Sequence, residues 1–445
     1  MIRYFRYMTT KNNNGDTMNE VLNYIEYPEN VEKYDTSKPP IRQKKLYKNL
    51  VYFLSNVFLS VIRAGYTIEK INMEGLKPPY ILLSNHMQIM DFCVSFKAVH
   101  PYRISNIATL DGYVGMVGIM ENLGSICKRK FTTDLSLVRS CRKVLHEYGD
   151  VLCMYPEARY SPIGTLSIIP DAVGKLVKSN KVPLVIMVHH GNYLNAPFWD
   201  FRQYRKVPFY ATMKQVLTAE EVQQKSADEI NEIIRKEMEY DEHRWQKENN
   251  IRITESFRAE GLHKVLYQCP HCKTESKMNS QGIHLFCEEC GKKWEMTELG
   301  EMKALEGETE FSHIPDWFEW ERTNVRQQIL DGTYKFEDDV HVHSLPGVEF
   351  IDLGEGKITH DFENGFVLTG HYNGHDYRIQ RNPKDMYSLH VEYAYKKLGK
   401  IDCFDVSVKD DSFYCIPTKK DVVTKLGFAT EEMFKIITEK RASKV

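Results

Sequence analysis

The sequence predicts an α/β domain, then a charged helical connector, a small cysteine-rich segment and a mostly antiparallel β domain that ends in a helix. Three observations predict this order. Short apolar runs alternate with helical stretches over residues 66–210, two Cys-x2-Cys pairs lie within residues 269–290, and apolar and polar residues alternate from His341 onward. A chain of 445 residues is also too long for one ordinary core, so several domains are expected.

The composition is that of a globular protein. Apolar residues make up 42% of the chain, charged residues 27%, and the net charge is −2. Proteins that bind nucleic acid through bulk charge carry a strong positive excess, so we expect no nucleic-acid partner. Ten cysteines without an export signal indicate a reducing compartment, and the cytoplasm is the expected location.

Residues 1–45 are polar and rich in asparagine, and we interpret them as a loosely ordered leader. Residues 46–64 are rich in Leu, Val, Phe and Tyr, but polar residues interrupt the ~20 apolar positions that a spanning helix requires. Basic residues precede this segment, which is typical of an amphipathic helix lying on an anionic membrane surface. A helix packed on the core of the domain is the alternative, and one helix can do both.

The α/β domain is expected over residues 46–215. Three apolar runs within it predict buried strands at residues 80–83, 151–155 and 184–188. Residues 135–148 have helical spacing, and Gly149 is their expected C-cap. Alternation of strand and helix implies a largely parallel sheet with its site at the carboxyl ends of the strands. His86 and Glu157 both follow predicted strands, so we expect them at that edge.

His86 and Asp91 are the candidate catalytic pair. Histidine suits a general base because its intrinsic pKa is near ~6.5, and an aspartate can fix its tautomer and stabilise the imidazolium. Residues five positions apart lie about 140° apart around a helix, so we expect His86 before a helix and Asp91 in its first turn. The absence of an activated serine or cysteine motif beside them favours direct attack by a substrate hydroxyl. A surface histidine beside a capping aspartate is the alternative.

With these residues the sequence resembles the glycerolipid acyltransferases, among them 1-acyl-sn-glycerol-3-phosphate acyltransferase. Asn85, His86 and Asp91 match the family's first motif, N-H-x4-D, and residues 155–157 match the start of its third motif, F-P-E-G-x-R. The resemblance covers about residues 45–210. It implies an α/β fold and O-acyl transfer from acyl-CoA or acyl-carrier protein to a lysophosphatidate-like glycerolipid. It also implies an enzyme held peripherally at the inner face of the membrane.

The resemblance further implies which residues contact the substrate. Asn85 belongs to the first motif, and Glu157 matches the residue that engages the glycerol hydroxyl region. Counting from Gly124 places Lys130 at the family's arginine and Arg129 at its acidic neighbour. A run of cations there is consistent with a site for an anionic headgroup. A solvated basic turn is the alternative.

The third motif of this chain departs from the family. Ala158 stands at the family's glycine and Tyr160 at its arginine, so that Arg159 is shifted by one position. Successive side chains of extended backbone point in opposite directions, so Arg159 either reaches the acceptor phosphate or points elsewhere. The apolar run at residues 182–188 matches the fourth motif and is expected to line the acyl channel. His189 follows it and is interpreted as structural.

Residues 216–260 predict the charged connector, with a capping box at residues 218–221 and a solvated polar face. Within residues 261–300, four cysteines have the spacing C-x2-C-x14-C-x2-C: Cys269, Cys272, Cys287 and Cys290. Two such pairs predict a tetrahedral, structural Zn²⁺ site of the zinc-ribbon type. Redox pairs and a metal-free knuckle are the alternatives. Four glutamates flank the ribbon, which argues against nucleic acid as its partner.

Residues 301–445 predict the β-rich domain, a small barrel or sandwich. Its expected strands are residues 341–345, 349–353, 357–362, 366–372, 376–380, 387–394, 401–408 and 413–416. Turns separate several of them, among them Gly354-Glu355-Gly356, and a helix is expected over residues 420–440. The domain is interpreted as binding lipid or a partner. The rival to an enzyme is a non-catalytic, membrane-associated zinc-ribbon adaptor that binds lipid.

Overall fold

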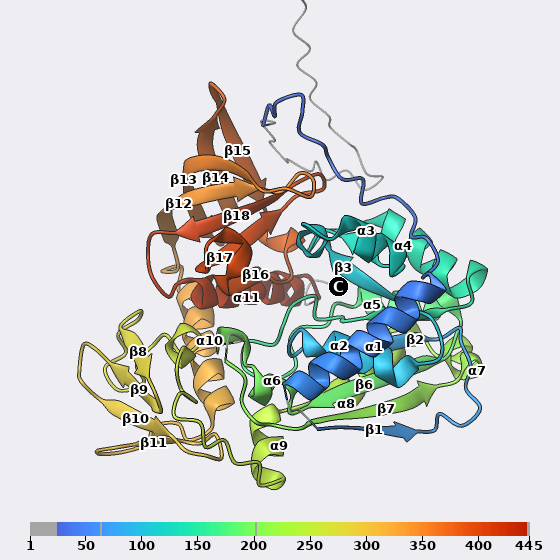
Figure 1. The fold of residues 1–445 in the computed structure, drawn as a ribbon. Coiled ribbons are helices and arrows are strands. Elements are labelled where there is room, and N and C mark those ends of the chain that lie inside the picture. Colours follow the sequence, from blue (N-terminus) through green and yellow to red (C-terminus); the bar gives the residue numbers. More distant parts are fainter. Residues whose placement is uncertain (1–24, 63–64, 133, 201–202, 443–445) are drawn as a thin grey trace, which may run out of the picture.

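The structure, a computed structural model, describes residues 25–62, 65–132, 134–200 and 203–442. It contains a seven-stranded mixed sheet, a four-stranded sheet and a second seven-stranded sheet. Figure 1 shows the mixed sheet on the right, the four-stranded sheet at the lower left and the second large sheet at the upper left. Helices α10 (Ile314–Leu330) and α11 (Val423–Ala442) pack against each other between the two sheets on the left.

The first sheet has the order β1-β7-β6-β2-β5-β3-β4. Its strands are β1 (Tyr66–Ile71), β2 (Ile81–Ser84), β3 (Ile104–Thr109), β4 (Ile126–Lys128), β5 (Val151–Met154), β6 (Leu184–His190) and β7 (Phe209–Leu217). Every neighbouring pair is parallel except β6 and β7, so the expectation of a largely parallel sheet is confirmed. The three strands expected from their apolar runs are β2, β5 and β6, which lie side by side at the centre. Their carboxyl ends therefore meet at one edge.

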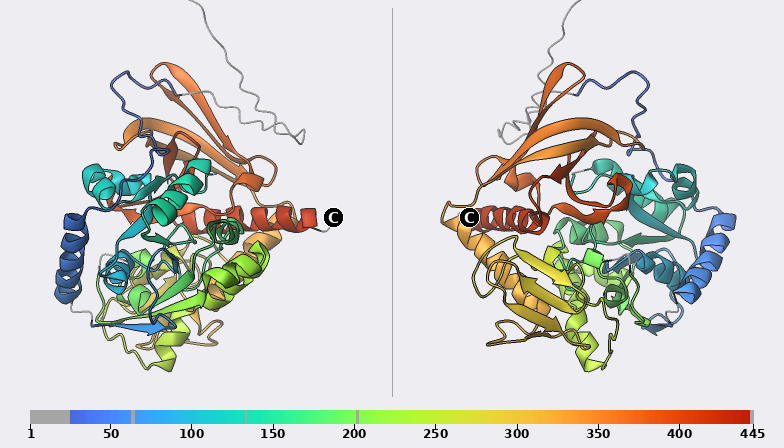
Figure 2. Two further views of the ribbon diagram at one scale, coloured as in Figure 1. Left: turned by 90° about the vertical axis from the view of Figure 1, so that its right-hand side faces the viewer. Right: turned by 60° about the vertical axis from the view of Figure 1, so that its left-hand side comes forward.

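Helices cover both faces of this sheet, and Figure 2 shows the layers from two further sides. Residues from α1 (Lys45–Val61) and α2 (Met90–Val99) share a core cluster with Leu82 of β2. The other face carries helices whose side chains pack with Ile81 and Leu83: α4 (Leu135–Arg142), α5 (Ala172–Asn180), α7 (Ala219–Gln224) and α8 (Ala227–Met238). Alternate residues of one buried strand thus face opposite helical layers, which explains its continuous apolar run.

The expected helical connector consists of three helices. Besides α7 and α8 it contains α9 (Glu242–Glu248), and the capping box expected at Thr218 is present. Helix α8 buries Ile230, Ile234 and Met238 in the cluster that holds the strands of the first sheet. Spacing of four residues places these three side chains on one helix face. The helix therefore completes the α/β core, and the expected boundary at residue 216 cuts through that core.

Short helical segments join these elements. They are η1 (Leu110–Tyr113), α3 (Val117–Asn122), the π-helical η2 (Lys143–Glu147), α6 (Asn192–Asn195), η3 (Phe198–Asp200), η4 (Leu262–Lys264), η5 (Pro383–Asp385) and η6 (Lys396–Leu398). Because η2 continues α4, the helix expected over residues 135–148 is present, and Gly149 ends it with φ of +65°. Only glycine adopts that backbone conformation without strain.

The four-stranded sheet has the order β11-β10-β9-β8 and antiparallel pairing. Its strands are β8 (Met278–Gln281), β9 (His284–Cys287), β10 (Lys293–Met296) and β11 (Met302–Ala304). Trp294 of β10 and Trp317 of α10 are both 0% exposed, and their rings cross with centroids 5.1 Å apart. One core cluster joins residues of this sheet, α10, α11 and the second large sheet. The ribbon and the β domain therefore share a core.

The second large sheet is antiparallel, with the order β15-β14-β13-β12-β18-β17-β16. Its strands are β12 (Phe336–Ser344), β13 (Ile351–Asp361), β14 (Gly365–Tyr372), β15 (His375–Arg381), β16 (His390–Tyr395), β17 (Ile401–Ser407) and β18 (Ser412–Pro417). The antiparallel β domain and its closing helix are thus confirmed. The turn expected at residues 354–356 is wrong, because β13 runs through it as one strand with a bulge.

Residues 25–44 contain neither helix nor strand, and residues 1–24 of the expected leader lie outside the described residues. The described part is tied to both large sheets. The Tyr27 hydroxyl hydrogen-bonds to Ser344 at 2.5 Å, and the Arg42 guanidinium pairs with Asp150 at 2.8 Å. This part of the leader therefore packs along the two domains, which differs from the loose segment that its composition predicts.

Candidate functional site

His86 and Asp91 lie in the turn between β2 and α2, with Asp91 in the first turn of the helix, as the spacing predicts. His86 Nδ1 lies 3.0 Å from Asp91 Oδ2. The same oxygen accepts hydrogen bonds from the backbone N–H groups of Met87 at 2.6 Å and Gln88 at 2.9 Å. Asn192 donates to the other carboxylate oxygen at 2.7 Å. Because Asp91 holds Nδ1, the Nε2 atom of His86 is the one left for a substrate.

The environment keeps His86 neutral and Asp91 ionised. Burial lowers the pKa of His86, and the positive charge of Lys130 adds to that effect, which outweighs the opposing influence of Asp91. Burial by itself raises the pKa of the Asp91 carboxyl, but His189 and His86 hold that pKa below its usual value. A neutral imidazole with its Nδ1–H directed at a carboxylate has its basic lone pair at Nε2.

Aromatic rings enclose the imidazole. The His86 ring stacks on Tyr155 with centroids 4.0 Å apart, and Tyr160 lies 4.2 Å away. Tyr160 then contacts Phe198, and Phe198 contacts Tyr393 of β16, each at 5.3 Å. These ring contacts therefore connect the candidate site to the second large sheet, and the His86 side chain keeps 20% exposure.

Glu157 and Asn85 hold the backbone around His86. One carboxylate oxygen of Glu157 accepts a hydrogen bond from the His86 N–H at 3.0 Å, and the other accepts from the Ser167 N–H at 2.8 Å. The Asn85 amide exchanges two hydrogen bonds with the backbone of His189, at 2.7 and 3.1 Å. Both side chains are buried, and burial raises the pKa of Glu157 to about 7. Their contacts are those of positioning residues, which differs from the substrate contacts that the family motif implies.

The two arginines expected at the substrate face the C-terminal domain. Arg129 donates to the carbonyl oxygens of Leu345 at 2.7 Å and Pro346 at 2.8 Å, and it is 3% exposed. Arg159 pairs with Glu431 of α11 at 2.6 Å and is 6% exposed. The structure therefore gives both guanidinium groups structural partners between domains. A sequence pattern cannot reveal this use, because those partners come from the distant β-rich half of the chain.

Lys130 acts electrostatically on His86 of the candidate pair. Among the described residues we find no hydrogen-bond or ion-pair partner for its ammonium group, and it is half-buried. Its charge acts on three groups: it contributes to the lowered pKa values of His86 and Asp111, and it opposes the rise in the pKa of His390. Asp111 is held at a pKa of about 2 by Lys130 and His390, although burial alone would raise that pKa. An anion beside His86 would thus meet the Lys130 charge.

Three residues of this region do not appear in the sequence motifs: Asn192, Asp111 and His390. Asn192 follows β6 as His86 follows β2, so its place at the shared sheet edge is a signal that could have identified it. His390 has no such local signal. Burial and Lys130 lower its pKa, but Asp405 and Glu392 outweigh them and raise that pKa to about 9, so its imidazole is charged at neutral pH.

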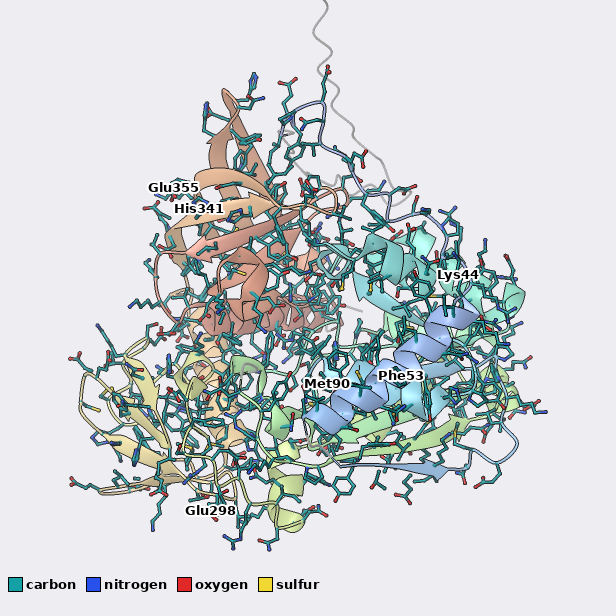
Figure 3. The ribbon with its side chains drawn as sticks, viewed as in Figure 1. Lys44, Phe53, Met90, Glu298, His341 and Glu355 are labelled. Atoms are coloured by element: carbon teal, nitrogen blue, oxygen red, sulfur yellow. The ribbon has the colours of Figure 1, made fainter. Side chains whose placement is uncertain are left out.

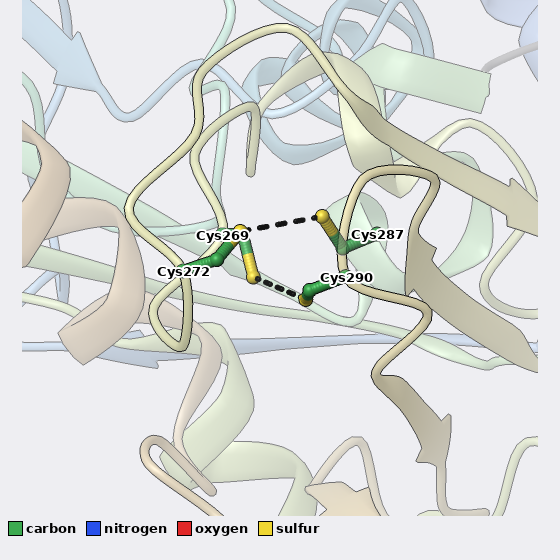
Figure 4. A group of neighbouring side chains, drawn as sticks. All are labelled: Cys269, Cys272, Cys287 and Cys290. Atoms are coloured by element: carbon green, nitrogen blue, oxygen red, sulfur yellow. Dashed lines mark hydrogen bonds between the residues drawn. The ribbon is translucent and has the colours of Figure 1, made fainter.

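The four predicted metal ligands meet in one cluster, which Figure 4 shows between two turns of the ribbon. The Sγ atoms of Cys269 and Cys290 are 3.8 Å apart, and those of Cys272 and Cys287 are 3.7 Å apart. Four sulfurs bound about 2.3 Å from a tetrahedral Zn²⁺ are about 3.8 Å apart, so these positions fit that ion. The cluster can hold a metal such as zinc, and we propose Zn²⁺ as its resident metal.

Chelation of this metal is expected to unfold the four-stranded sheet, because structural zinc sites contribute about 10–16 kcal/mol to zinc-finger folding. The measurement is zinc content by elemental analysis together with the fluorescence of the buried tryptophans. Cys272→Ser is expected to lose the zinc. Cys93→Ser, which changes a half-buried cysteine outside the cluster, is expected to keep it. A purified wild type that is free of zinc and insensitive to a chelator would contradict the proposal.

Helix α1 exposes much of its apolar surface. Exposure reaches 73% for Leu46, 61% for Phe53, 51% for Phe58 and 71% for Val61, whereas Ser55 and Leu59 are buried. Figure 3 labels Phe53 on the outward side of this helix and Lys44 at its N-terminal end. Among the described residues, none of the helices has both the length and the apolar character needed to cross a membrane.

No protein-family model matches the sequence, and no curated protein matches it either. Among solved structures, the chain is similar to the 1-acyl-sn-glycerophosphate (LPA) acyltransferase, PlsC, from Thermotoga maritima. The two are 12% identical, with a TM-score of 0.36, and the match covers 43% of this chain and 77% of that one. Likeness at that level carries no weight on function, so the candidate site depends on its own geometry.

Proposed function

We propose that the protein is an O-acyltransferase that moves a fatty acyl group from acyl-CoA or acyl-carrier protein to a hydroxyl of a lysophosphatidate-like glycerolipid. The observation that carries this proposal is the pair His86–Asp91. The Asp91 carboxylate accepts hydrogen bonds from Met87, Gln88 and Asn192. It also holds Nδ1 of the His86 imidazole, which leaves Nε2 for the acceptor hydroxyl. A thioester is already activated, so the protein has to remove a proton from the acceptor hydroxyl and align the two reactants.

The reaction needs one base and no covalent enzyme intermediate. Nε2 of His86 takes the proton of the acceptor hydroxyl as its oxygen bonds to the thioester carbonyl carbon. When the C–S bond breaks, the leaving thiolate receives that proton from the imidazolium, which gives an ester and a free thiol. Asp91 stabilises the imidazolium between these steps. The lowered pKa of His86 keeps the imidazole unprotonated at neutral pH, as a base requires.

The acceptor's anionic headgroup is proposed to lie against Lys130. Of the five residues that the family motifs assign to the substrate, four are buried and engaged with protein groups: Asn85, Arg129, Glu157 and Arg159. The Lys130 side chain alone makes no hydrogen bond or ion pair among the described residues, and its charge acts on Asp111 and His86. A phosphate there would be neutralised beside the base.

The deciding experiment is an acyl-transfer assay with long-chain acyl-CoA or acyl-carrier protein as donor and a panel of lysophospholipids as acceptors. The panel compares lysophosphatidate with lysophospholipids that have larger headgroups and with an acceptor that lacks the phosphate. Formation of the diacyl product supports the proposal and names the acceptor. A wild type that binds lipid but is inert with every pair would overturn it in favour of the non-catalytic adaptor.

We further propose that the protein acts at the inner face of the membrane, with α1 lying in the lipid interface. Seven apolar side chains of this helix are more than a third exposed: Leu46, Leu50, Phe53, Leu54, Val57, Phe58 and Val61. Lys44 and Lys45 are exposed at the start of the same helix, where they would meet anionic headgroups. An apolar face next to exposed lysines fits a lipid surface better than it fits water.

Replacing Phe53 and Phe58 together with glutamate is expected to abolish sedimentation with vesicles that contain anionic phospholipid. Each buried phenylalanine contributes about 1.5–3 kcal/mol, so the affinity is expected to fall at least about 100-fold. Leu330→Glu changes a 54% exposed leucine at the end of α10 and serves as the matched control. Equal binding by the double variant and the control would show that α1 is not the lipid contact.

A further inference from the structure

Two histidines and two carboxylates gather on the outer face of the second large sheet. His341 and His343 are alternate residues of β12, so their side chains point to the same face. Asp352 and Glu355 lie opposite them on β13, where His343 pairs with Asp352 and His341 pairs with Glu355 in the strand register. Figure 3 labels His341 and Glu355 on the second large sheet at the upper left, away from Phe53 of α1.

A β-bulge brings the two carboxylates to one face. Asp352 and Glu355 are three positions apart, so a regular strand would direct them to opposite faces. The register shifts between Val342 and His343, where the partner changes from Gly354 to Asp352. Gly354 has φ of +76°, and its N–H donates to Asp352 Oδ1 at 2.8 Å. Bulges of this kind redirect side chains and are frequent next to functional sites.

The distances within this cluster suit a single ion. The ligand atoms of His341, His343 and Asp352 all lie within 4.8 Å of one another. Two atoms bound tetrahedrally to one Zn²⁺ at about 2.0–2.2 Å are about 3.4 Å apart, so the three groups need only small adjustments. His341 Nε2 is 2.8 Å from Asp352 Oδ1, so these two candidate ligand atoms are neighbours.

Glu355, the fourth group of the cluster, contacts His341 rather than the proposed ion. Glu355 Oε1 lies 2.8 Å from His341 Nδ1, so it holds the ring nitrogen that faces away from Asp352. Histidines that bind metals almost always donate their other ring N–H to a carboxylate, which fixes the tautomer and raises the basicity of the ligand atom. A simple histidine–carboxylate ion pair does not require a second imidazole such as that of His343. The pair His371–Asp376 on the same sheet, also at 2.8 Å, lacks one.

We propose that His341, His343 and Asp352 bind a divalent transition-metal ion such as Zn²⁺, with Glu355 orienting His341. Two imidazole nitrogens and a carboxylate oxygen form a donor set suited to Zn²⁺ and poorly suited to Mg²⁺. His341 is 35% and Asp352 62% exposed, so the ion is reached from solvent and water completes its coordination. The site is separate from the four cysteines and from His86, and it does not depend on the proposed acyl transfer.

The test is a calorimetric titration of the full-length protein with Zn²⁺ after dialysis to remove loosely held metal. Wild type is expected to bind one more zinc ion than His343→Ala. The variant's affinity should fall by more than about 100-fold, because loss of a ligand costs more than the roughly 10–100-fold that loss of an outer partner costs. Glu355→Gln is expected to fall within that 10–100-fold range. Mg²⁺ at the same concentration should give no binding.

His371→Ala is the matched control, because it removes an exposed histidine paired with a carboxylate on the same sheet. Its zinc stoichiometry and affinity are expected to equal those of wild type. Far-UV circular dichroism of each variant checks that the sheet is intact. The proposal is overturned if wild type takes up no zinc beyond that bound by His343→Ala, or if the two alanine variants bind it alike.

Discussion

Replacement of His86 by asparagine is expected to lower kcat/KM for acyl transfer by about 10²–10⁴-fold, the range that a positioned general base contributes. The asparagine amide can keep the hydrogen bond that Nδ1 makes with Asp91 Oδ2, but it offers no basic atom at the place of Nε2. The variant should therefore fold and bind lipid as wild type does. Initial rates with the donor and acceptor that the lysophospholipid panel identifies give the ratio.

His146→Asn is the matched control for this prediction, because His146 is an exposed histidine of the segment that continues α4. Its rate is expected to equal that of wild type. Comparable rates for His86→Asn and His146→Asn, with wild type active, would exclude His86 as the base while leaving acyl transfer itself intact.

Glu431→Ala is expected to lower the free energy of unfolding by about 3–5 kcal/mol, because it removes the carboxylate that pairs with the buried guanidinium of Arg159. Arg322 loses one of its carboxylate partners but keeps Glu319 and Glu432. The Glu431 carboxylate lies 2.6 Å from Arg159 and 2.5 Å from Arg322, and Ser388 donates to it at 2.7 Å. Its side chain is 1% exposed. Urea denaturation followed by tryptophan fluorescence measures the change, because Trp294 and Trp317 lie in the core that α11 helps to form.

Glu439→Ala provides the comparison on the same helix. Glu439 pairs with Arg326 at 2.7 Å but is 61% exposed, and exposed pairs contribute about 0–1 kcal/mol. A loss for Glu431→Ala no greater than that for Glu439→Ala would show that the buried network does not hold the domains together.

The stabilisation that Glu431 gives the folded protein depends on pH, because its pKa is lower in the folded protein than its ordinary value. Burial alone would raise that pKa, but Arg159 and Arg322 outweigh it and lower the pKa to about 2, below the ordinary value of 4.5. The unfolded chain therefore binds a proton before the folded protein does. The stabilisation is fully present above about pH 4.5 and is lost as the pH falls toward 2. The difference between wild type and Glu431→Ala should shrink over that range.

Local patterns predicted the elements that hold the candidate site. The apolar runs before His86 and Glu157 are β2 and β5, and the five-residue spacing from His86 to Asp91 predicted their turn, because the helical repeat fixes which residues can meet within one turn. The paired Cys-x2-Cys spacing likewise predicted a cluster that the fold assembles. Each inference needed only the geometry of a strand, a turn or a knuckle.

The roles of Arg129 and Arg159 could not be predicted in this way. Their partners Leu345, Pro346 and Glu431 come from the C-terminal domain, so a motif that covers the first half of the chain describes only one side of each contact. Strand β13 is a second case. Glycines at positions 354 and 356 indicate a turn, but pairing with β12 and β14 on either side carries the strand through them as a bulge.

The sequence by itself thus determined the α/β order, the contact between His86 and Asp91 and the four-cysteine cluster, because residues close in the chain set the geometry of each. Only the tertiary structure decided that ring contacts connect His86 to the β domain, that the two arginines bind that domain, and that His341, His343 and Asp352 meet. Those outcomes depend on which distant surfaces pack together. Burial and backbone pairing between domains set them, and no local spacing encodes that information.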